Sequence, residues 1–418
     1  MGAGRAASGE RFVAGRPQRS DMPSQDFEAW FRLLTWPGVT RPMARRLLRA
    51  LGAPQAVLGA SASQWAAAAG PTAAQALSTP DPQSSARLQL ALEWLAGHPA
   101  RQVLTLDDAA YPPPLLHCGD PPLMLFLEGR AQLLQRPAVA VVGSRQATPQ
   151  GLAHARQFAS VLSQAGVTVV SGLATGIDGA AHEGALAGEG STLAVIGTGP
   201  DIVYPARHRG LWRRVAQEGL VVSEHVPGTP PLAHHFPHRN RLIAGLTRGT
   251  LVVEATLKSG SLITARLAME GGRDVFAVPG SIQSPQSRGC HELIRQGAQL
   301  VESAQEILEA LRLAAGPAVS AVSTASPVSP TAATAAAASA ASEGPDEAYG
   351  PDEPAQPDAG TPEGRLLRAM GHDPVSLDTL VGRTGDAASA LGARLLELEL
   401  QGLVARLPGG RYQRQQAA

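Results

Sequence analysis

The chain has almost no lysine, few cysteines and few aromatic residues. Lys258 is the only lysine, so nearly all of the 35 basic residues are arginines, and 35 acidic residues balance them. A net charge of zero excludes a protein whose whole surface attracts polyanions, so any nucleic-acid site must be a local patch. The two cysteines, Cys118 and Cys290, match no zinc or CxxC spacing and suit a reducing compartment.

Long apolar runs are also missing. No apolar stretch reaches the roughly 20 residues that span a bilayer, and the first residues contain no apolar segment typical of a secretion signal. We therefore expect a soluble cytoplasmic protein that does not enter a membrane. A chain of 418 residues is too long for one ordinary core, so two or three domains are expected.

Composition divides the chain into an N-terminal helical part and a central α/β part, each bordered by low-complexity sequence. Residues 1–25 are rich in Gly, Arg and Ser and are expected to be disordered, whereas residues 26–100 show helical spacing of apolar residues. Residues 101–314 alternate strand and helix patterns. Residues 315–360, rich in Ala, Ser, Pro and Thr, are expected to form a linker.

Residues 361–418 predict three helices followed by a two-stranded ribbon that turns at Gly409-Gly410, which suggests a winged helix. Arginines of the ribbon could contact duplex DNA. Glu397 and Glu399 in the third helix would repel phosphate, so a protein contact is the alternative. The arginines concerned are Arg406, Arg411 and Arg414.

In the first helical part, an apolar-Pro-Gly-Val turn at residues 36–39 separates two helical patterns. A SAM-like or helix-hairpin-helix domain, whose turn amides contact a DNA phosphate, and a small helical packing module both fit this pattern. The second helix has a basic face, which solvated arginines also produce. Its arginines are Arg41, Arg45, Arg46 and Arg49.

The central part is expected to form a doubly wound parallel sheet. Its short apolar runs do not alternate with polar residues, and helical patterns lie between them, as right-handed βαβ crossovers require. An antiparallel lead-in is expected over residues 103–129. The expected strands are 139–142, 167–171, 193–197, 220–223, 250–254, 274–278 and 299–301, and the expected helices are 150–165, 177–187, 207–217, 260–270, 290–296 and 304–314.

The glycine-rich strand ends lack the fingerprints of common cofactor sites. Gly143-Ser-Arg-Gln stands where the dinucleotide motif GxGxxG would follow the first strand, and the single lysine is not preceded by glycine, as a Walker A motif requires. NAD and FAD are therefore disfavoured, and a Walker A ATPase is excluded. His234, His235 and His238 cluster, but no carboxylate or cysteine completes a ligand set, so a polar turn is expected there and no metal site.

Three strand ends instead offer main-chain N–H groups to an anion at the carboxyl edge of the sheet. The guanidinium of Arg145 can grip a phosphate, whereas pairing with a carboxylate such as Asp178 is the structural alternative. Asp178 is interpreted as a helix cap, and His182 as a satisfied histidine on the same helix face. The candidate residues at these ends are Gly143, Ser144, Arg145, Ser171, Gly172 and Gly176.

A basic tetrapeptide follows later in the central part. Arg239 and Arg241 flank Asn240 after Phe236, a pattern typical of a single-strand reader in which arginines contact the backbone and the ring stacks on a base. Alternatively, Phe236 belongs to the core and only one arginine faces outward.

A second cationic point begins the helix expected at 260–270. Lys258, Ser259 and Gly260 combine a positive charge with free helix N–H groups, which predicts a second phosphate site. Arg207, after Tyr204-Pro205, could extend the same track.

Five motifs in this order resemble the DprA/Smf family, the DNA-processing proteins of natural transformation. The resemblance runs from about Tyr111 to Leu308, and the flanking segments match the tripartite plan of that family. The motifs are Gly143-Ser-Arg145, Ser171-Gly-Leu-Ala-Thr-Gly-Ile-Asp178 with Ala181-His182, Gly197-Thr-Gly199 with Tyr204-Pro205, Phe236-Pro-x-Arg-Asn-Arg-x-Ile-Ala-Gly245, and Lys258-Ser-Gly-Ser-Leu-Ile-Thr-Ala265.

The resemblance implies an extended Rossmann-like fold that binds single-stranded DNA, protects it and helps to load the recombinase RecA. It implies a homodimer formed through the sheet domain, without cofactor or catalysis. It also implies a phosphate-binding role for Arg145 and Lys258, and extends that role to Arg239 and Arg241. The chain departs from the family pattern at His225, at His238 and at Gly289-Cys-His-Glu292.

A nucleotide-processing enzyme such as a phosphoribohydrolase is the alternative. Glu224 or Glu254, near strand ends, would serve as the general base. The Gly-Gly-x-Gly-Thr phosphate loop that usually precedes such an acid is missing from the sequence. We therefore favour binding without turnover.

Overall fold

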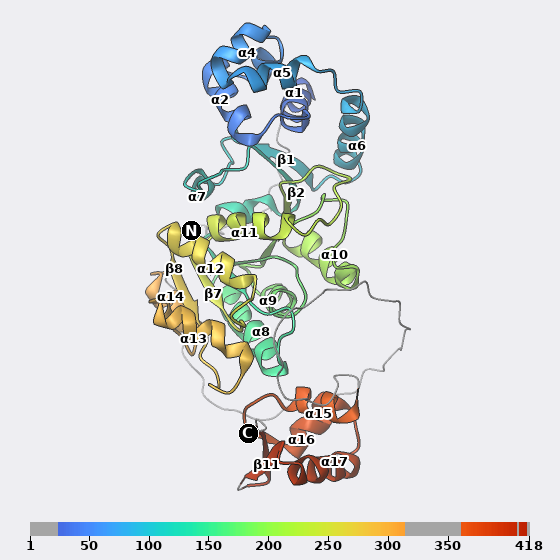
Figure 1. The fold of residues 1–418 in the computed structure, drawn as a ribbon, viewed down its shortest axis with the longest axis vertical. Coiled ribbons are helices and arrows are strands. Elements are labelled where there is room, and N and C mark those ends of the chain that lie inside the picture. Colours follow the sequence, from blue (N-terminus) through green and yellow to red (C-terminus); the bar gives the residue numbers. More distant parts are fainter. Residues whose placement is uncertain (1–23, 314–360, 408, 416–418) are drawn as a thin grey trace, which may run out of the picture. The chain divides into compact units, whose positions relative to one another are not determined.

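A computed structural model of the protein describes residues 24–313, 361–407 and 409–415 (Figure 1). The chain divides into two compact units, Met1–Ala314 and Ala315–Ala418. The disorder expected for residues 1–25 lies outside the described residues except at 24 and 25, which belong to the first helix. The linker expected at 315–360 lies outside them as well. The further division of the first unit near residue 100 stays a prediction.

The first unit begins with short helices. Thr40 caps the second of them by accepting a hydrogen bond from the Met43 amide, and Gly52 ends it. Apolar side chains around Leu33, Leu47 and Leu77 form the core of this helical part. The helices are α1 (Ser24–Thr35), α2 (Arg41–Leu51), α3 (Pro54–Leu58), α4 (Ala62–Ala69), α5 (Pro71–Ser78) and α6 (Ser84–Ala96).

The basic face of α2 is not simply solvated, as the sequence had suggested. Arg41 donates to Asp120 at 2.5 Å and lies 3.4 Å from Glu224. Arg45 forms an ion pair with Asp120 and donates to the carbonyl oxygen of Pro121 at 3.0 Å. These arginines therefore attach the helical part to loops of the sheet that follows.

A sheet forms the centre of the first unit, and its nine described strands run in the order β1-β2-β6-β5-β4-β3-β7-β8-β9. β1 and β2 are antiparallel, whereas all the strands from β6 to β9 in that order are parallel. This confirms both the parallel sheet and its antiparallel lead-in. The strands are β1 (Arg101–Thr105), β2 (Met124–Gly129), β3 (Ala138–Val142), β4 (Thr168–Ser171), β5 (Thr192–Ile196), β6 (Leu220–Ser223), β7 (Gly249–Val252), β8 (Asp274–Ala277) and β9 (Gln299–Leu300).

Helices cover both faces of this sheet, which explains why its strands are continuously apolar. Alternate residues of β3 face two different cores: Val139 and Val141 pack with α8, α9 and α14, whereas Ala140 and Val142 pack with α11, α12 and α13. α10 packs on the α9 side. These helices are α8 (Pro149–Gln164), α9 (Ile177–Ala185), α10 (Arg209–Glu218), α11 (His235–Leu246), α12 (Ser261–Glu270), α13 (Arg288–Arg295) and α14 (Ala304–Ala310).

Short helical turns complete the first unit: α7 (Pro113–Leu116), η1 (Ala131–Gln135), η2 (Ala206–His208) and η3 (Pro285–Ser287). The sequence predicted every one of the longer covering helices except α11. Its first turn contains Pro237 and a cluster of histidines, so its helical pattern was read as a polar turn. The structure corrects that reading, because His235 and His238 belong to the helix.

The direction in which strands are added reverses between β3 and β7. After β3, the chain adds β4, β5 and β6 on one side, and it then returns to add β7, β8 and β9 on the other. Loops leaving the carboxyl ends of β3 and β7 therefore diverge to opposite sides. In parallel sheets this switch point is where ligands bind.

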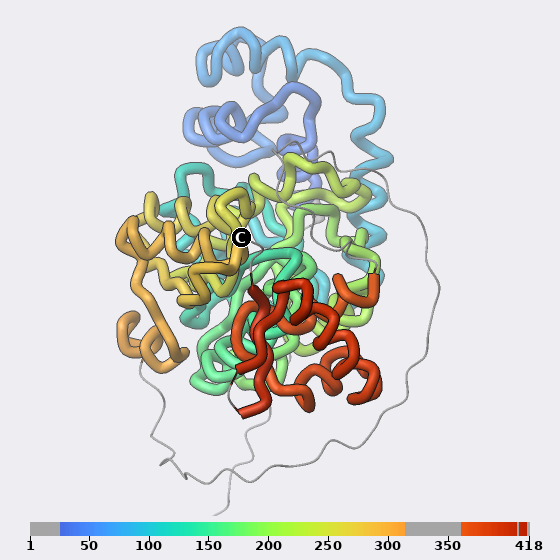
Figure 2. Tube along the Cα trace, turned by 60° about the horizontal axis from the view of Figure 1, so that its bottom comes forward, coloured from blue at the N-terminus to red at the C-terminus, as the bar shows by residue number. Residues whose placement is uncertain are grey.

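The second unit has its own core, built around Leu366, Leu380, Leu391 and Leu395 (red in Figure 2). Three helices and a small sheet in the order β10-β12-β11 confirm the expected winged helix. β10 is only two residues long and was not predicted. The elements are α15 (Pro362–Met370), β10 (Val375–Ser376), α16 (Leu377–Thr384), α17 (Ala388–Leu400), β11 (Val404–Leu407) and β12 (Arg411–Arg414). None of the described helices of the chain has both the length and the apolar character needed to cross a bilayer.

Candidate nucleic-acid interface

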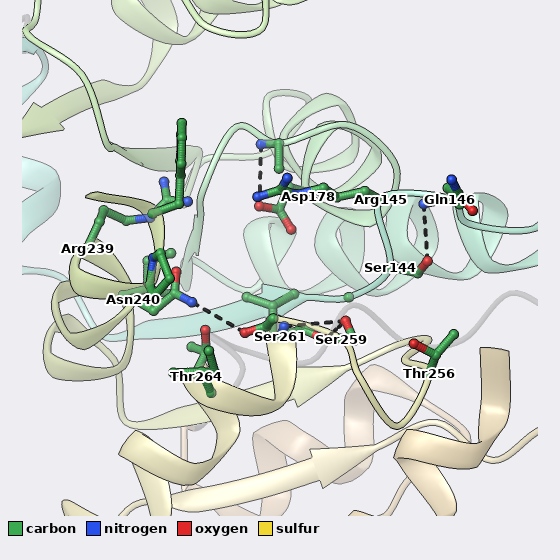
Figure 3. A pocket seen from close by; sticks show the side chains of 18 of the residues that line it. Ser144, Arg145, Gln146, Asp178, Arg239, Asn240, Thr256, Ser259, Ser261 and Thr264 are labelled. Atoms are coloured by element: carbon green, nitrogen blue, oxygen red, sulfur yellow. Dashed lines mark hydrogen bonds between the residues drawn. The ribbon is translucent and has the colours of Figure 1, made fainter. Parts of the chain in front are cut away.

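A pocket of about 450 Å³ opens where β3 and β7 end (Figure 3). Its walls come from the β3–α8 loop, the β4–α9 loop, the first turns of α11 and the β7–α12 loop with the start of α12. We call this pocket the crevice. The candidate residues that line it are Gly143, Ser144, Arg145, Phe236, Arg239, Asn240, Ser259 and Gly260.

The rim of the crevice combines a cation with an aromatic ring. Arg145 is exposed, and its guanidinium carbon lies 5.8 Å from the centroid of the Phe236 ring. Phe236 is half-buried at the start of α11 and is therefore not part of the core. A cation at the rim can bind a phosphate, and an accessible aromatic ring beside it can stack on a base.

The β7–α12 loop forms the opposite wall. The Ser259 and Ser261 hydroxyls are hydrogen-bonded at 2.7 Å, and the Asn240 side-chain amide donates to the Gly260 carbonyl oxygen at 3.4 Å (Figure 3). Lys258 is exposed immediately before this wall but does not line the crevice. The predicted combination of a cation with the beginning of a helix is therefore present at the edge of the site.

The main-chain amides that follow β4 are not free to bind a phosphate, as the sequence had predicted they would be. The Asp178 carboxylate accepts from the amides of Gly172 at 3.1 Å and Ala174 at 3.4 Å, and His182 Nε2 accepts from the Leu173 amide at 3.2 Å. Asp178 thus occupies the position that a phosphate was expected to take. Ser171 is buried as well, and its hydroxyl donates to the Val141 carbonyl oxygen. The predicted amide contacts of this segment are corrected accordingly.

His182 is a satisfied internal residue, as expected. Its Nδ1 lies 2.7 Å from the Thr192 hydroxyl oxygen, and the ring is fully buried. Burial lowers the pKa of His182 to about 3, so the ring is neutral and its Nε2 can accept the Leu173 amide.

Gly176 contributes through its backbone conformation. Its φ of +77° lies in the left-handed region, and a Cβ at this position would come within 2.2 Å of the Ser144 carbonyl oxygen. The same carbonyl accepts the Ile177 amide at 3.1 Å. Gly176 therefore allows the start of α9 to close against the β3–α8 loop.

Arg239 lies at the floor of the crevice and is almost fully buried. It is only 6% exposed, donates to the Gly172 carbonyl oxygen at 2.8 Å, and forms a second hydrogen bond to the Val195 carbonyl oxygen. Burial lowers the pKa of Arg239 to about 10, while the Asp178 carboxylate opposes that shift. Its interpretation as a surface phosphate contact is therefore corrected: Arg239 holds the floor of the crevice together.

Arg241 is also removed from the surface. It forms a tight ion pair with Glu224, its side chain is 11% exposed, and its Nε donates to His238 at 3.3 Å. It does not line the crevice. The sequence had suggested that at least one of the two arginines faces outward, but both are engaged within the protein.

The candidate general bases of an enzyme are engaged as well. Glu254 accepts from the Thr148 amide at 2.9 Å and from the Thr148 hydroxyl at 2.5 Å, next to the start of α8. Glu224 pairs with Arg241 and Arg41. Both carboxylates therefore serve structural contacts.

The histidines near the start of α11 contact one another through their rings. His225 stacks on His235 with ring centroids 4.0 Å apart, and His234 meets His235 edge-on. Burial lowers the pKa of His225 to about 3. In the part of the chain that the structure describes, no group of three His, Cys, Asp or Glu side chains could hold a metal ion.

Some lining residues carried no signal in the sequence. Gln286 of η3 belongs to the wall because its carbonyl oxygen accepts the Ala255 amide at 2.7 Å, which folds η3 against the end of β7. Thr256 precedes the recognised Lys258 motif, and Gln146 follows Arg145. No spacing rule relates Gln286 to β3, so only the folded chain reveals it.

Comparisons with known proteins agree with this geometry. The model of the family described as DNA recombination-mediator protein A matches residues 102–312, and that of the DprA winged helix domain matches residues 350–410. Protein Smf of Escherichia coli (strain K12) is 40% identical over 325 residues, which cover 77% of this chain and 80% of that protein. DNA processing protein DprA of Streptococcus pneumoniae (strain ATCC BAA-255 / R6) is 51% identical over 203 residues, covering 49% of this chain and 71% of that protein.

A solved structure agrees as well. The X-ray structure of DNA processing protein A (DprA) from Streptococcus pneumoniae superposes with a TM-score of 0.58 and 38% sequence identity, covering 68% of this chain and 96% of that chain.

Proposed function

This chain belongs to the DNA recombination-mediator protein A family, and from this premise we propose that it binds single-stranded DNA in the crevice without altering it chemically. The observation that carries the proposal is the crevice rim, where the exposed Arg145 lies over Phe236 and opposite the start of α12. A cation can hold a backbone phosphate while the ring stacks on an unpaired base. Bases in a duplex are already stacked and paired, so this arrangement favours single strands.

The contacts of Glu224 and Glu254 support binding without turnover. Glu254 is engaged by Thr148, and Glu224 by Arg241, so neither is placed as a free general base. The phosphoribohydrolase alternative predicts release of free base from nucleoside monophosphates. Detection of that release with purified protein would revive it.

We further propose that the bound strand is protected and handed to a RecA-type recombinase in the cytoplasm, with no cofactor. The name of the family, a recombination mediator, supports this step. A homodimer through the sheet domain is part of the proposal. The described sheet ends at β9, where Leu300 is 44% exposed, and a second copy could cover such an edge.

For the C-terminal winged helix, we propose a protein contact in preference to duplex DNA. The outer face of α17, the third helix, carries Leu396 at 56% and Leu400 at 81% exposure, with Glu397 beside them. A helix that reads the major groove would present donors and cations on this face.

The test is a titration of labelled oligo-dT, followed by fluorescence anisotropy at several salt concentrations. Arg145→Ala and Lys258→Ala should each weaken binding about equally for all base sequences, because phosphate contacts carry no base information. Each should also reduce the log–log salt slope by about 0.7, the value for one phosphate contact on a single strand.

Arg214→Ala is the matched control. Arg214 is exposed, lies on α10 and makes only a 3.7 Å pair with Glu218, which precedes β6 at the amino edge of the sheet. It should leave affinity and slope unchanged. If Arg145→Ala and Lys258→Ala behave like this control, the crevice is not the DNA site.

A further inference from the structure

Tyr204 stands apart from every other aromatic residue in the described part of the chain. It is 45% exposed, and among those residues it is the only aromatic side chain classed as exposed. Because apolar surface is stabilised by burial, an aromatic ring left this exposed gives up part of that stabilisation. Tyr111 shows the contrast, since it is buried and its hydroxyl donates to the Pro122 carbonyl oxygen at 2.8 Å.

The ring of Tyr204 continues the aromatic rim of the crevice. Its centroid lies 5.3 Å from that of Phe236 and the two rings are tilted by 38°. Phe236 in turn lies beneath the Arg145 guanidinium. The three side chains thus form a connected row that starts in the crevice and ends at an exposed ring outside it, since Tyr204 does not line the crevice.

Two arginines follow Tyr204 closely in the chain. Arg207 lies in η2 and Arg209 begins α10, and both are exposed. His208, between them, points inward instead, with Nδ1 3.0 Å from the Leu173 carbonyl oxygen. The turn is therefore fixed to the floor of the crevice while its arginines face the solvent.

We propose that Tyr204 and Arg207 form a second nucleotide subsite, in which a base of the single strand leaving the crevice stacks on Tyr204 and the adjoining phosphate pairs with Arg207. This inference rests on the proposed function of the crevice and adds a base-stacking position outside it. An aromatic face and a cation recognise any unpaired nucleotide, so the subsite adds affinity without base specificity.

Oligonucleotide length separates the two sites. A single nucleotide (dTMP), used here as the short strand, can stack on Phe236 beneath Arg145 without covering Tyr204, whereas a strand of about 16 nucleotides covers both rings, whose centroids are 5.3 Å apart. Tyr204→Ala should weaken binding of the long strand about 5- to 150-fold, the equivalent of one lost base stack, and should leave the short strand unaffected. Tyr204→Phe keeps the ring and should bind both strands as the unaltered protein does.

Two further measurements test stacking itself. The Tyr204→Ala defect should vanish when the long strand carries abasic sites in place of bases, because no base is left to stack. Tyr204→Trp should show fluorescence quenching by the long strand beyond that of the unaltered protein. Arg207→Ala should lower the salt slope by about 0.7 with the long strand only.

The outcomes distinguish this inference from the proposed function. If Arg145→Ala loses binding while Tyr204→Ala binds the long strand normally, the second subsite is wrong and the crevice stands. An equal loss by Tyr204→Ala on short, long and abasic strands would also overturn the subsite, because the ring would then act only through Phe236. If Arg145→Ala and Lys258→Ala also bind normally, the proposed function fails as well.

Discussion

Replacing Arg239 with Met tests whether this arginine supports the crevice or contacts DNA. The buried guanidinium donates to the carbonyl oxygens of Gly172 and Val195, and its charge opposes the rise in the pKa of Asp178 that burial causes. Met has a similar length but no charge and no donors. The change therefore leaves two buried carbonyl oxygens without this donor and removes a positive charge that acts on Asp178.

The expected magnitude follows from these contacts. Each buried carbonyl oxygen left without its donor costs about 1–3 kcal/mol of unfolding free energy, and the loss of the positive charge near the buried Asp178 adds to this cost. The loss should depend on pH. Burial raises the pKa of Asp178, and Arg239 opposes this rise. Without Arg239 the folded-state pKa rises further above the unfolded value of about 3.9, so the deficit should be small near that pH and should grow as the pH increases.

Urea unfolding followed by tryptophan fluorescence is the assay. All five tryptophans belong to the first unit, so the signal reports that unit alone: Trp30, Trp36, Trp65, Trp94 and Trp212. Arg156→Met is the control, because Arg156 forms an exposed pair with Glu183 at 2.9 Å and should change stability by about 0–1 kcal/mol. The double variant Arg239→Met with Asp178→Asn should recover part of the loss, since no buried charge remains.

Binding distinguishes the two roles. A supporting residue should lower the affinity for oligo-dT without changing the salt slope, because the phosphate contacts themselves remain. If Arg239→Met keeps its stability but loses affinity and about 0.7 of the slope, Arg239 contacts phosphate directly and the reasoning from its burial is refuted.

Other changes should have equally specific effects. Acid should destabilise the first unit: burial lowers the pKa of His182 to about 3, so its stabilising effect is complete above about pH 6.5 and is lost as the pH falls, by about 2 kcal/mol at pH 5. His182→Gln should flatten this acid dependence in urea unfolding, and an unchanged profile would assign it to other groups. Gly176→Ala should lower the stability of the first unit and should weaken oligo-dT binding at least about tenfold. The added Cβ would lie 2.2 Å from the Ser144 carbonyl oxygen, and the backbone here has a left-handed conformation. Normal binding would show that the loop adjusts. Deleting residues 360–418 should leave most single-strand affinity in the first unit, and nearly complete loss would move the main site to the winged helix.

Much of the fold was predictable because its patterns are local. The parallel strands are short apolar runs, and helical spacing between them indicates the crossovers, so the sheet and most of its helices were recognised. α11 was not, because Pro237 and the histidines in its first turn resemble a turn. β10 was missed because two residues carry no pattern.

The site was predictable only in part. The glycine-rich strand ends and the arginine- and lysine-containing motifs do meet at one crevice, because the carboxyl ends of parallel strands lie at the same edge of the sheet. The sequence could not tell which basic residues stay exposed. Both Arg145 and Arg239 are arginines within recognised motifs, so the sequence does not distinguish them. Arg145 is exposed at the rim of the crevice, whereas Arg239 is only 6% exposed at its floor.

Most strands and longer helices, and the family motifs that they carry, could be predicted from the amino-acid sequence, because they depend on each residue and its near neighbours. The role of each polar group became visible only in the folded chain. The Asp178 carboxylate accepts a hydrogen bond from an amide that was expected to bind a phosphate, and Glu224 forms an ion pair with Arg241. Such pairing depends on distances between residues far apart in the chain, and on the high cost of leaving a buried charge or N–H group without a partner.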